Sequence, residues 1–193
     1  MEPFKKKYEE TPFQTAGPYL HIGCMPNYLG INGIYKNDIG IMPFPKKMSE
    51  ELITITGSVF DGNEEALDDV FLETWQSDTN GKYFENHGFA RFIPNKITKK
   101  YSLITIKPGS VENFDGIKQS PHILLSISSR GLNMSLNTRI YFEDDNLTSD
   151  PLLSTVKNVR NDVSSLIAKK IGNNTYSFDI FLQGDKETIF LDI

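Results

Sequence analysis

From Leu52 onward the sequence breaks into short segments in which apolar and polar residues alternate, and this pattern strongly constrains the fold. Ile53, Ile55 and Val59 alternate with polar residues ahead of a turn at 61–63. Because successive side chains of a β-strand point to opposite faces, such alternation predicts half-buried strands. Further strands are expected at 70–76, 101–106, 122–128, 136–142, 176–182 and 188–193.

One late segment follows a helical period instead. Its apolar residues recur at spacings of three and four, at Leu152, Val156, Val159, Val163, Leu166 and Ile167. Asp150 and Pro151 suit a helix start and Gly172 suits its end, so we expect a helix at about 151–170. Short strands with one late helix predict a mainly β chain, an antiparallel β-sandwich.

Residues 1–50 differ from the rest, because prolines and glycines interrupt every regular period there. We expect an irregular arm, and a segment of this length without repeats is usually functional or wrapped over a neighbour. No linker or internal repeat divides the chain. We therefore expect a single domain over residues 1–193, with the arm at 1–50 and the sandwich with its helix at 51–193.

Composition narrows the possible functions. Hydrophobic residues make up 38% of the 193 residues, enough for a packed core, and the net charge of -5 without a basic stripe disfavours nucleic acid. No apolar run is long enough to span a membrane and no secretory signal is visible, so we expect a cytoplasmic protein. The single cysteine, Cys24, allows no internal disulfide and is expected to be buried.

His122 and Leu124 form an interrupted metal-binding pattern. Residues i and i+2 of a strand share a face, so a His-x-His pair could bind one metal ion. Leu124 cannot donate to a metal. The pattern indicates half of a metal site, although a buried histidine is more often a hydrogen-bonded core residue.

Several patches, taken in order along the chain, resemble the intradiol ring-cleaving dioxygenases, and among them the iron-free chains of the heteromeric members. The patches lie at 11–23, 57–63, 71–83, 105–109, 120–123, 138–142 and 178–184.

The resemblance implies an iron centre with two of its ligands missing. Members of the family hold Fe(III) through two tyrosinates and two histidines, and hard anionic oxygen donors favour that ion. The corresponding positions here are Tyr83, Val111, His122 and Leu124, which we call the relic positions. Gln119 also replaces an arginine of the iron-bearing relatives. We therefore expect no metal ligands and no catalytic residues in this chain alone. Tyr83 could instead be a plain packing aromatic.

The resemblance also implies a partner. A homologous beta subunit would carry Fe(III), and the substrate would be an aromatic dihydroxy acid, protocatechuate, opened by O2 to 3-carboxy-cis,cis-muconate. The residues expected to approach the substrate from this chain are Thr15, Gly17, Pro18, Tyr19 and Arg130. Arginine suits a substrate carboxylate.

Plainer interpretations stay open at this stage. Gly17 and Pro18 could simply shape a bend, and Arg130 before Gly131 could be a solvated turn residue. The whole chain could be a non-catalytic scaffold or binding module, or an intradiol dioxygenase acting on another catechol.

Overall fold

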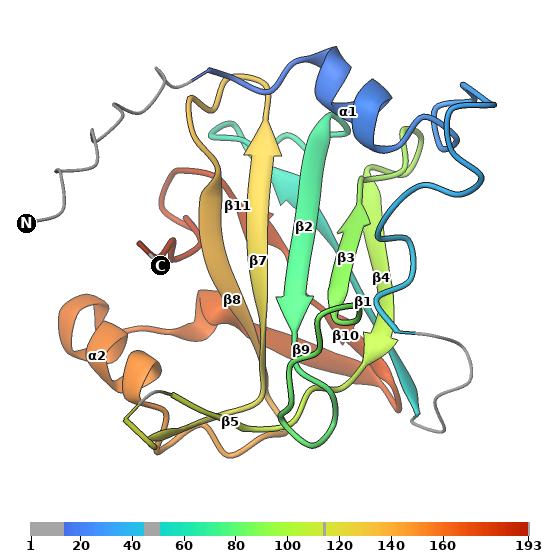
Figure 1. Cartoon of the computed structure of the whole chain (residues 1–193). Coiled ribbons are helices and arrows are strands. Elements are labelled where there is room, and N and C mark those ends of the chain that lie inside the picture. The colour runs from blue at the N-terminus through green and yellow to red at the C-terminus, as the bar shows by residue number, and fades with distance from the viewer. Residues whose placement is uncertain (1–13, 45–50, 114, 193) are drawn as a thin grey trace, which may run out of the picture.

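The computed structural model describes residues 14–44, 51–113 and 115–192 (Figure 1). The start of the expected arm and its segment 45–50 therefore lie outside the described residues. The helices are α1 (Pro18–Cys24), α2 (Pro151–Arg160) and the 3-10 turn η1 (Ser164–Leu166). The strands are β1 (Leu52–Phe60), β2 (Val70–Gln76), β3 (Phe89–Phe92), β4 (Lys100–Ile106), β5 (Val111–Glu112), β6 (Lys118–Gln119), β7 (His122–Ser129), β8 (Leu136–Phe142), β9 (Ile167–Gly172), β10 (Thr175–Ser177) and β11 (Ile180–Phe181).

A nine-stranded sheet forms most of the fold, in the order β11-β1-β10-β9-β8-β7-β2-β3, with β4 paired to β1. The mainly β class with a late helix is confirmed. The sheet is mixed rather than purely antiparallel, because β10 and β11 run parallel to β1 and β9 runs parallel to β8. The chain between β8 and β9 contains α2, and a crossover of this length is what a parallel pair requires.

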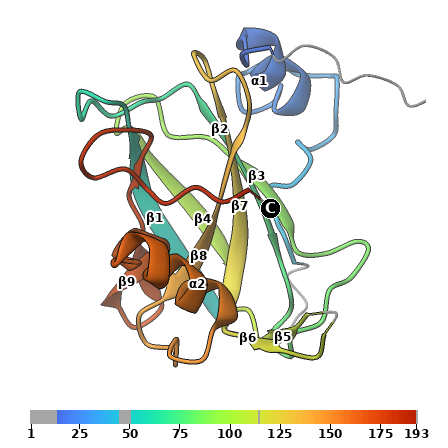
Figure 2. The same ribbon diagram turned by 90° about the vertical axis from the view of Figure 1, so that its left-hand side faces the viewer.

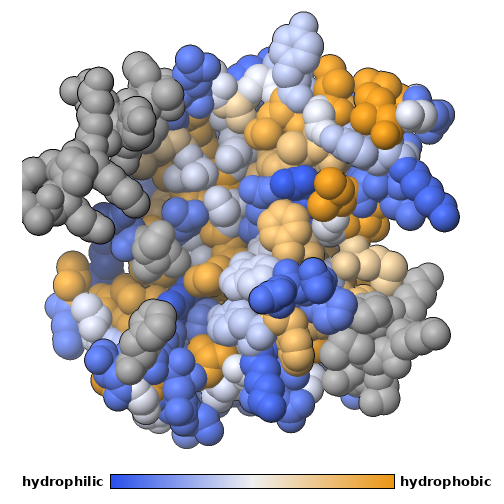
Figure 3. All heavy atoms as spheres, in the orientation of Figure 1, coloured by the Kyte–Doolittle hydropathy of each residue, from blue (hydrophilic) through white to orange (hydrophobic). Residues whose placement is uncertain are grey.

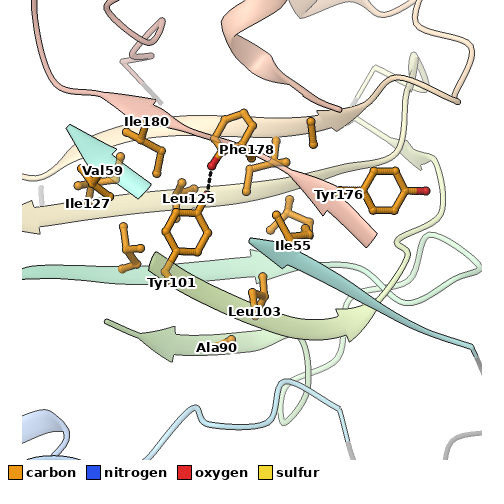
Figure 4. Packing of buried hydrophobic residues seen from close by; sticks show 14 of the residues in the cluster. Ile55, Val59, Ala90, Tyr101, Leu103, Leu125, Ile127, Tyr176, Phe178 and Ile180 are labelled. Atoms are coloured by element: carbon orange, nitrogen blue, oxygen red, sulfur yellow. Dashed lines mark hydrogen bonds between the residues drawn. The ribbon is translucent and has the colours of Figure 1, made fainter. Parts of the chain in front are cut away.

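The core lies where the sheet folds over itself, so that β1 and β4 face β2 and β7 (Figure 2). The expected alternation is confirmed, since Ile55, Val59 and Ile123 are fully buried. Figure 4 shows side chains from both layers meeting in this space, with the Tyr101 hydroxyl donating to the Phe178 carbonyl. Burial of these aromatic and aliphatic side chains is the main stabilising term of the fold.

The late helix begins as predicted and ends earlier. Asp150 is the N-cap, its side chain accepting from the Leu153 amide at 3.0 Å. The helix stops at Arg160 because Asn161 takes a left-handed conformation with φ 61°. The expected continuation to about residue 170 is therefore wrong. The apolar residues beyond 161 still pack beside α2, but from η1 and the start of β9.

The arm contains a helix that the sequence did not reveal. α1 spans seven residues with Pro18 at its first position, and it packs over a small cluster of Met25, Phe71 and Ile93. Cys24 is half-buried at the edge of this cluster, rather than buried as expected. The arm then runs beside β3, whose Arg91 amide donates to the Gly40 carbonyl at 2.8 Å.

Two other expectations about strands are corrected. The segment 176–182 is divided between β10 and β11, and β3 was not predicted. Residues 188–192 form no strand, although Thr188 is buried and exchanges hydrogen bonds of 2.9 Å with Phe181. No helix among the described residues is long and apolar enough to cross a membrane.

Candidate functional site

The residues expected to act lie at opposite ends of one strand, β7. Figure 1 shows α1 beside the end of β7 at Ser129, whereas β5 lies beside its start at His122. A strand rises about 3.3 Å per residue, which separates these ends by about 23 Å. The arm residues and Arg130 form the first group, and the relic positions form the second.

Two packed turns bring the relic positions Tyr83 and Val111 close together. Gly81 has a φ of 78°, and a Cβ there would collide with the Ser110 carbonyl. The Gly109 amide donates to the Asp78 carbonyl at 2.7 Å. The turn signals in the sequence therefore mark a close approach of two loops, which sets Tyr83 and Val111 beside the start of β7.

Tyr83 packs as an aromatic side chain at this end. Its ring stacks on Trp75, with centroids 5.9 Å apart and planes inclined by 12°. The side chain is 42% exposed. Burial raises the pKa of the Tyr83 hydroxyl, and the positive charge of Arg139 partly opposes this. Val111 is buried in β5, opposite Gln119 of β6.

His122 and Leu124 share the face of β7 that points away from the main core. His122 is 3% exposed, and its Nδ1 lies 2.8 Å from the Ser120 carbonyl. Burial, reinforced by the charge of Arg139, lowers the pKa of His122 to about 4. His122 is thus a neutral, hydrogen-bonded histidine at ordinary pH, which agrees with the plainer interpretation of this residue.

Arg139 lies between the relic positions, and the sequence analysis did not single it out. It stands directly opposite Leu124 on β8, and its Nη1 donates to Gln119 Oε1 at 2.7 Å and to the Tyr141 hydroxyl at 3.3 Å. A guanidinium is thus present although Gln119 replaces the expected arginine. The signal that could have found it is a charged residue opposite Leu124 in an otherwise alternating strand.

The relic positions do not fit a ferric ion. Tyr83 and His122 could donate to a metal, but Val111 and Leu124 carry only aliphatic side chains. Two protein donors are too few to hold and select Fe(III). Within residues 14–44, 51–113 and 115–192, no group of three or more His, Cys, Asp and Glu side chains is placed to hold a metal ion.

At the other end of β7, Thr15 fixes the arm to the loop that follows the strand. Its hydroxyl accepts from the Gly131 amide at 2.7 Å and donates to the Ser129 carbonyl at 3.3 Å. Gly17 is then the N-cap of α1, and Pro18 suits the first helical position. Tyr19 projects outward and is 85% exposed.

Arg130 and the arm line a common depression of about 330 Å³, which we call the arm hollow. Gly17 and Pro18 line it too, so three of the five expected substrate-facing residues meet there. Arg130 forms an ion pair of 2.8 Å with Asp69, and its side chain is 75% exposed. His21 also borders the hollow, and burial lowers its pKa against the opposing charge of Asp69. Asp69 and His21 were not predicted.

Comparison with known proteins places this geometry in a family. Residues 26–184 match the family model described as Dioxygenase. The alpha chain of protocatechuate 3,4-dioxygenase from Pseudomonas putida is 38% identical over 195 residues, covering 95% of this chain and 96% of that one. The alpha chain from Burkholderia cepacia is 29% identical and covers 96% and 98%.

Solved structures agree on the fold. The dioxygenase domain of a carbohydrate-binding fusion protein from Streptomyces sp. SirexAA-E superposes with a TM-score of 0.57 at 22% identity, covering 91% of this chain and 99% of that one. The 3-chlorocatechol 1,2-dioxygenase of Rhodococcus opacus 1CP gives 0.56 at 22% identity, covering 72% and 63%. Together with the nearly end-to-end match to the Pseudomonas protein, these findings show that the chain belongs to the intradiol dioxygenase family, in its group of protocatechuate 3,4-dioxygenase alpha chains.

Proposed function

We propose that this chain acts as the iron-free alpha subunit of a two-chain enzyme that cleaves protocatechuate with O2 to 3-carboxy-cis,cis-muconate. A homologous beta subunit would bind the Fe(III), which supplies the activation of the catechol. This chain would line the substrate pocket and build the oligomer.

The observation that carries the proposal is the separation of the two groups along β7. The arm hollow lies beyond the Ser129 end of β7, which the rise of the strand places about 17 Å from Leu124 and about 23 Å from His122. Arg130 and Gly17 therefore cannot serve a reaction at this chain's own relic positions. Residues that face a catalytic centre from the arm hollow must face one in another chain.

Within that shared site, Arg130 would bind the substrate carboxylate. Its side chain is 75% exposed and paired with Asp69, so its guanidinium can reach a ligand in front of the hollow. A guanidinium pairs well with a planar carboxylate. Gly17, Pro18 and Tyr19 would form the wall beside the ring, and Thr15 would hold this wall against β7 through its two backbone contacts.

An apolar surface on the arm supports the presence of a partner. The segment 28–42 exposes many large hydrophobic side chains, and Figure 3 shows apolar atoms gathered at the upper right, where Figure 1 places this segment. They include Tyr28, Ile34, Tyr35, Ile39, Ile41 and Met42. Clusters of this kind mark protein interfaces. The segment is also well braced, since Asp38 accepts from the Asn27 and Tyr28 amides at 3.0 and 2.8 Å.

The direct test is expression of this chain with and without a beta-type chain. We expect the pair to co-purify as a coloured Fe(III) complex that cleaves protocatechuate, and this chain alone to be colourless and inactive. A coloured, active chain purified alone would overturn the proposal and favour a self-sufficient dioxygenase. Failure to pair with any beta-type chain would favour a scaffold.

The role of Arg130 is tested in the same complex. We expect Arg130→Ala to raise the KM for protocatechuate by about tenfold or more, with iron content unchanged, because a charge-assisted contact is lost. Arg160→Ala, at the exposed end of α2, is the matched control. An unchanged KM for the Arg130 variant would remove this residue from the pocket.

A further inference from the structure

A second hollow lies on the outer face of β2, β7 and β8, away from the arm hollow. Its volume is about 370 Å³. We call it the Trp75 hollow, and its walls include Trp75, Phe89, Leu124, Ser126, Asn137 and Arg139. Sites of a few hundred Å³ with apolar walls and a few polar groups are typical of small ligands.

Arg139 gives this hollow a positive charge without a direct counter-ion. Among the described residues, no carboxylate forms an ion pair with its guanidinium. Nη1 is used by Gln119 and Tyr141, while Nε is buried and has no hydrogen-bond partner within the described part of the chain. Protein atoms cover Nε, so a carboxylate in the hollow would be met by the remaining guanidinium nitrogen, Nη2, which can donate to it.

The surroundings hold Arg139 in place and add no competing negative charge to it. The Tyr141 hydroxyl accepts from Arg139 and donates to Asp150 Oδ1 at 3.2 Å. Tyr141 therefore separates the guanidinium of Arg139 from the carboxylate of Asp150. Glu73 borders the hollow, but Arg91 pairs with it at 2.6 Å. Asp150 and Glu73 therefore leave the positive charge of Arg139 available to a ligand.

The remaining walls suit a flat ring. Trp75 and Phe89 border the hollow, and Tyr83 stacks on Trp75 from the side of the relic positions. Leu124 adds an aliphatic surface where a histidine ligand would stand in an iron-bearing chain. An aromatic wall and a guanidinium together match a ring that carries one carboxylate.

We propose that the Trp75 hollow is a second binding site, for a small aromatic carboxylate, with Arg139 as the group that pairs with the carboxylate. The site is distinct from the arm hollow and lies wholly within this chain. It does not depend on the iron-bearing partner.

The chain offers a direct probe, because Trp75 is its single tryptophan. Titration of the full chain with benzoate should give a saturable change in Trp75 fluorescence, with a Kd at or below about 1 mM for so small a ligand. Arg139→Gln should weaken binding by about tenfold or more, and Arg139→Lys by less, because it keeps the charge. Thermal unfolding of each variant checks that the fold is intact.

Matched controls separate the alternatives. Benzamide lacks the charge and acetate lacks the ring, so both should bind weakly. Lys186→Ala should leave the fluorescence titration unchanged, because it removes an exposed positive charge that pairs with Glu64 and borders neither hollow. A folded wild-type chain that gives no saturable change, or a folded Arg139→Gln variant that binds benzoate as well as wild type, would overturn the proposal.

Discussion

The two ends of β7 differ in how far their charged and titratable side chains are exposed to solvent. At the arm end, the charged side chain of Arg130 is three-quarters exposed and held by a single ion pair. At the relic end, Arg139 is partly buried and fixed by Gln119 and Tyr141, and His122 is almost fully covered. The arm end, which we call the open end, is suited to contact with another molecule. The relic end, which we call the closed end, is suited to stability and to a small ligand.

The closed end shows how polar groups are paired where the resemblance places the lost ligands of a metal centre. Polar groups that remain in such a site must find partners, because unpaired buried groups are costly. Here His122 is bonded to the Ser120 carbonyl, and Asp150 accepts from the Ser120 amide at 2.8 Å. Hydrogen bonds thus hold together the segments that a metal ion would otherwise join.

The largest effect should come from Asp150, which anchors the closed end. Its carboxylate is fully buried and accepts from Ser120, Tyr141 and Leu153. We expect Asp150→Ala to lower the free energy of unfolding by about 3–5 kcal/mol, because three buried donors lose their acceptor. Urea denaturation measures this. The exposed Asp185→Ala should change it by less than about 0.5 kcal/mol, and a similarly small loss for Asp150 would show that the network is not holding this end.

A smaller effect should depend on pH through His122. Its pKa falls from 6.5 in the unfolded chain to about 4 in the folded protein, so folding favours the neutral ring. The resulting stability is fully present above pH 6.5 and is lost as the pH falls from 6.5 towards 4. This loss amounts to about 3 kcal/mol.

Removing the imidazole should remove that pH dependence. His122→Asn should be less stable than wild type at pH 7, and the gap between the two should narrow steadily towards pH 4. Denaturation curves at several pH values measure the gap. If the gap stays constant with pH, His122 is not responsible for the acid sensitivity at the closed end.

At the open end, Asp69 should have a modest effect that concerns substrate binding. If Arg130 binds the substrate as proposed, the Asp69 carboxylate would compete with the substrate carboxylate for it, and exposed ion pairs contribute up to about 1 kcal/mol. We therefore expect Asp69→Asn to lower the KM for protocatechuate by about two- to fivefold in the complex. The KM for uncharged catechol should stay the same. A fall for both substrates would mean that Asp69 acts through the shape of the hollow.

Local signals in the sequence predicted the parts of the fold that depend on neighbouring residues. Alternation found the core faces of β1 and β7, and Asp150 with Pro151 marked the start of α2. The end of α2 was missed because Val163 and Leu166 keep the helical spacing while packing from a turn. Val159, placed on the same apolar stripe, is 76% exposed.

The residues of the site were likewise predicted only where a local sequence pattern marked them. The resemblance located the relic positions, and the structure brings Tyr83, Val111 and His122 to one end of β7. Arg139 was missed because its contact with Gln119 of β6 and its place opposite Leu124 of β7 join different strands, and cross-strand contacts leave no local pattern. Parallel pairing of β9 with β8 was missed for the same reason.

The smallest expected effect sharpens the contrast between the two ends. Tyr83→Phe keeps the ring that stacks on Trp75 and removes only a hydroxyl from a side chain that is 42% exposed. Stability should change by less than about 0.5 kcal/mol, because such exposed changes are usually near neutral. If the iron belongs to the partner, the colour and iron content of the complex should also be unchanged. Loss of iron from this variant would mean that Tyr83 still binds the metal, and the closed end would then be a working centre rather than a relic.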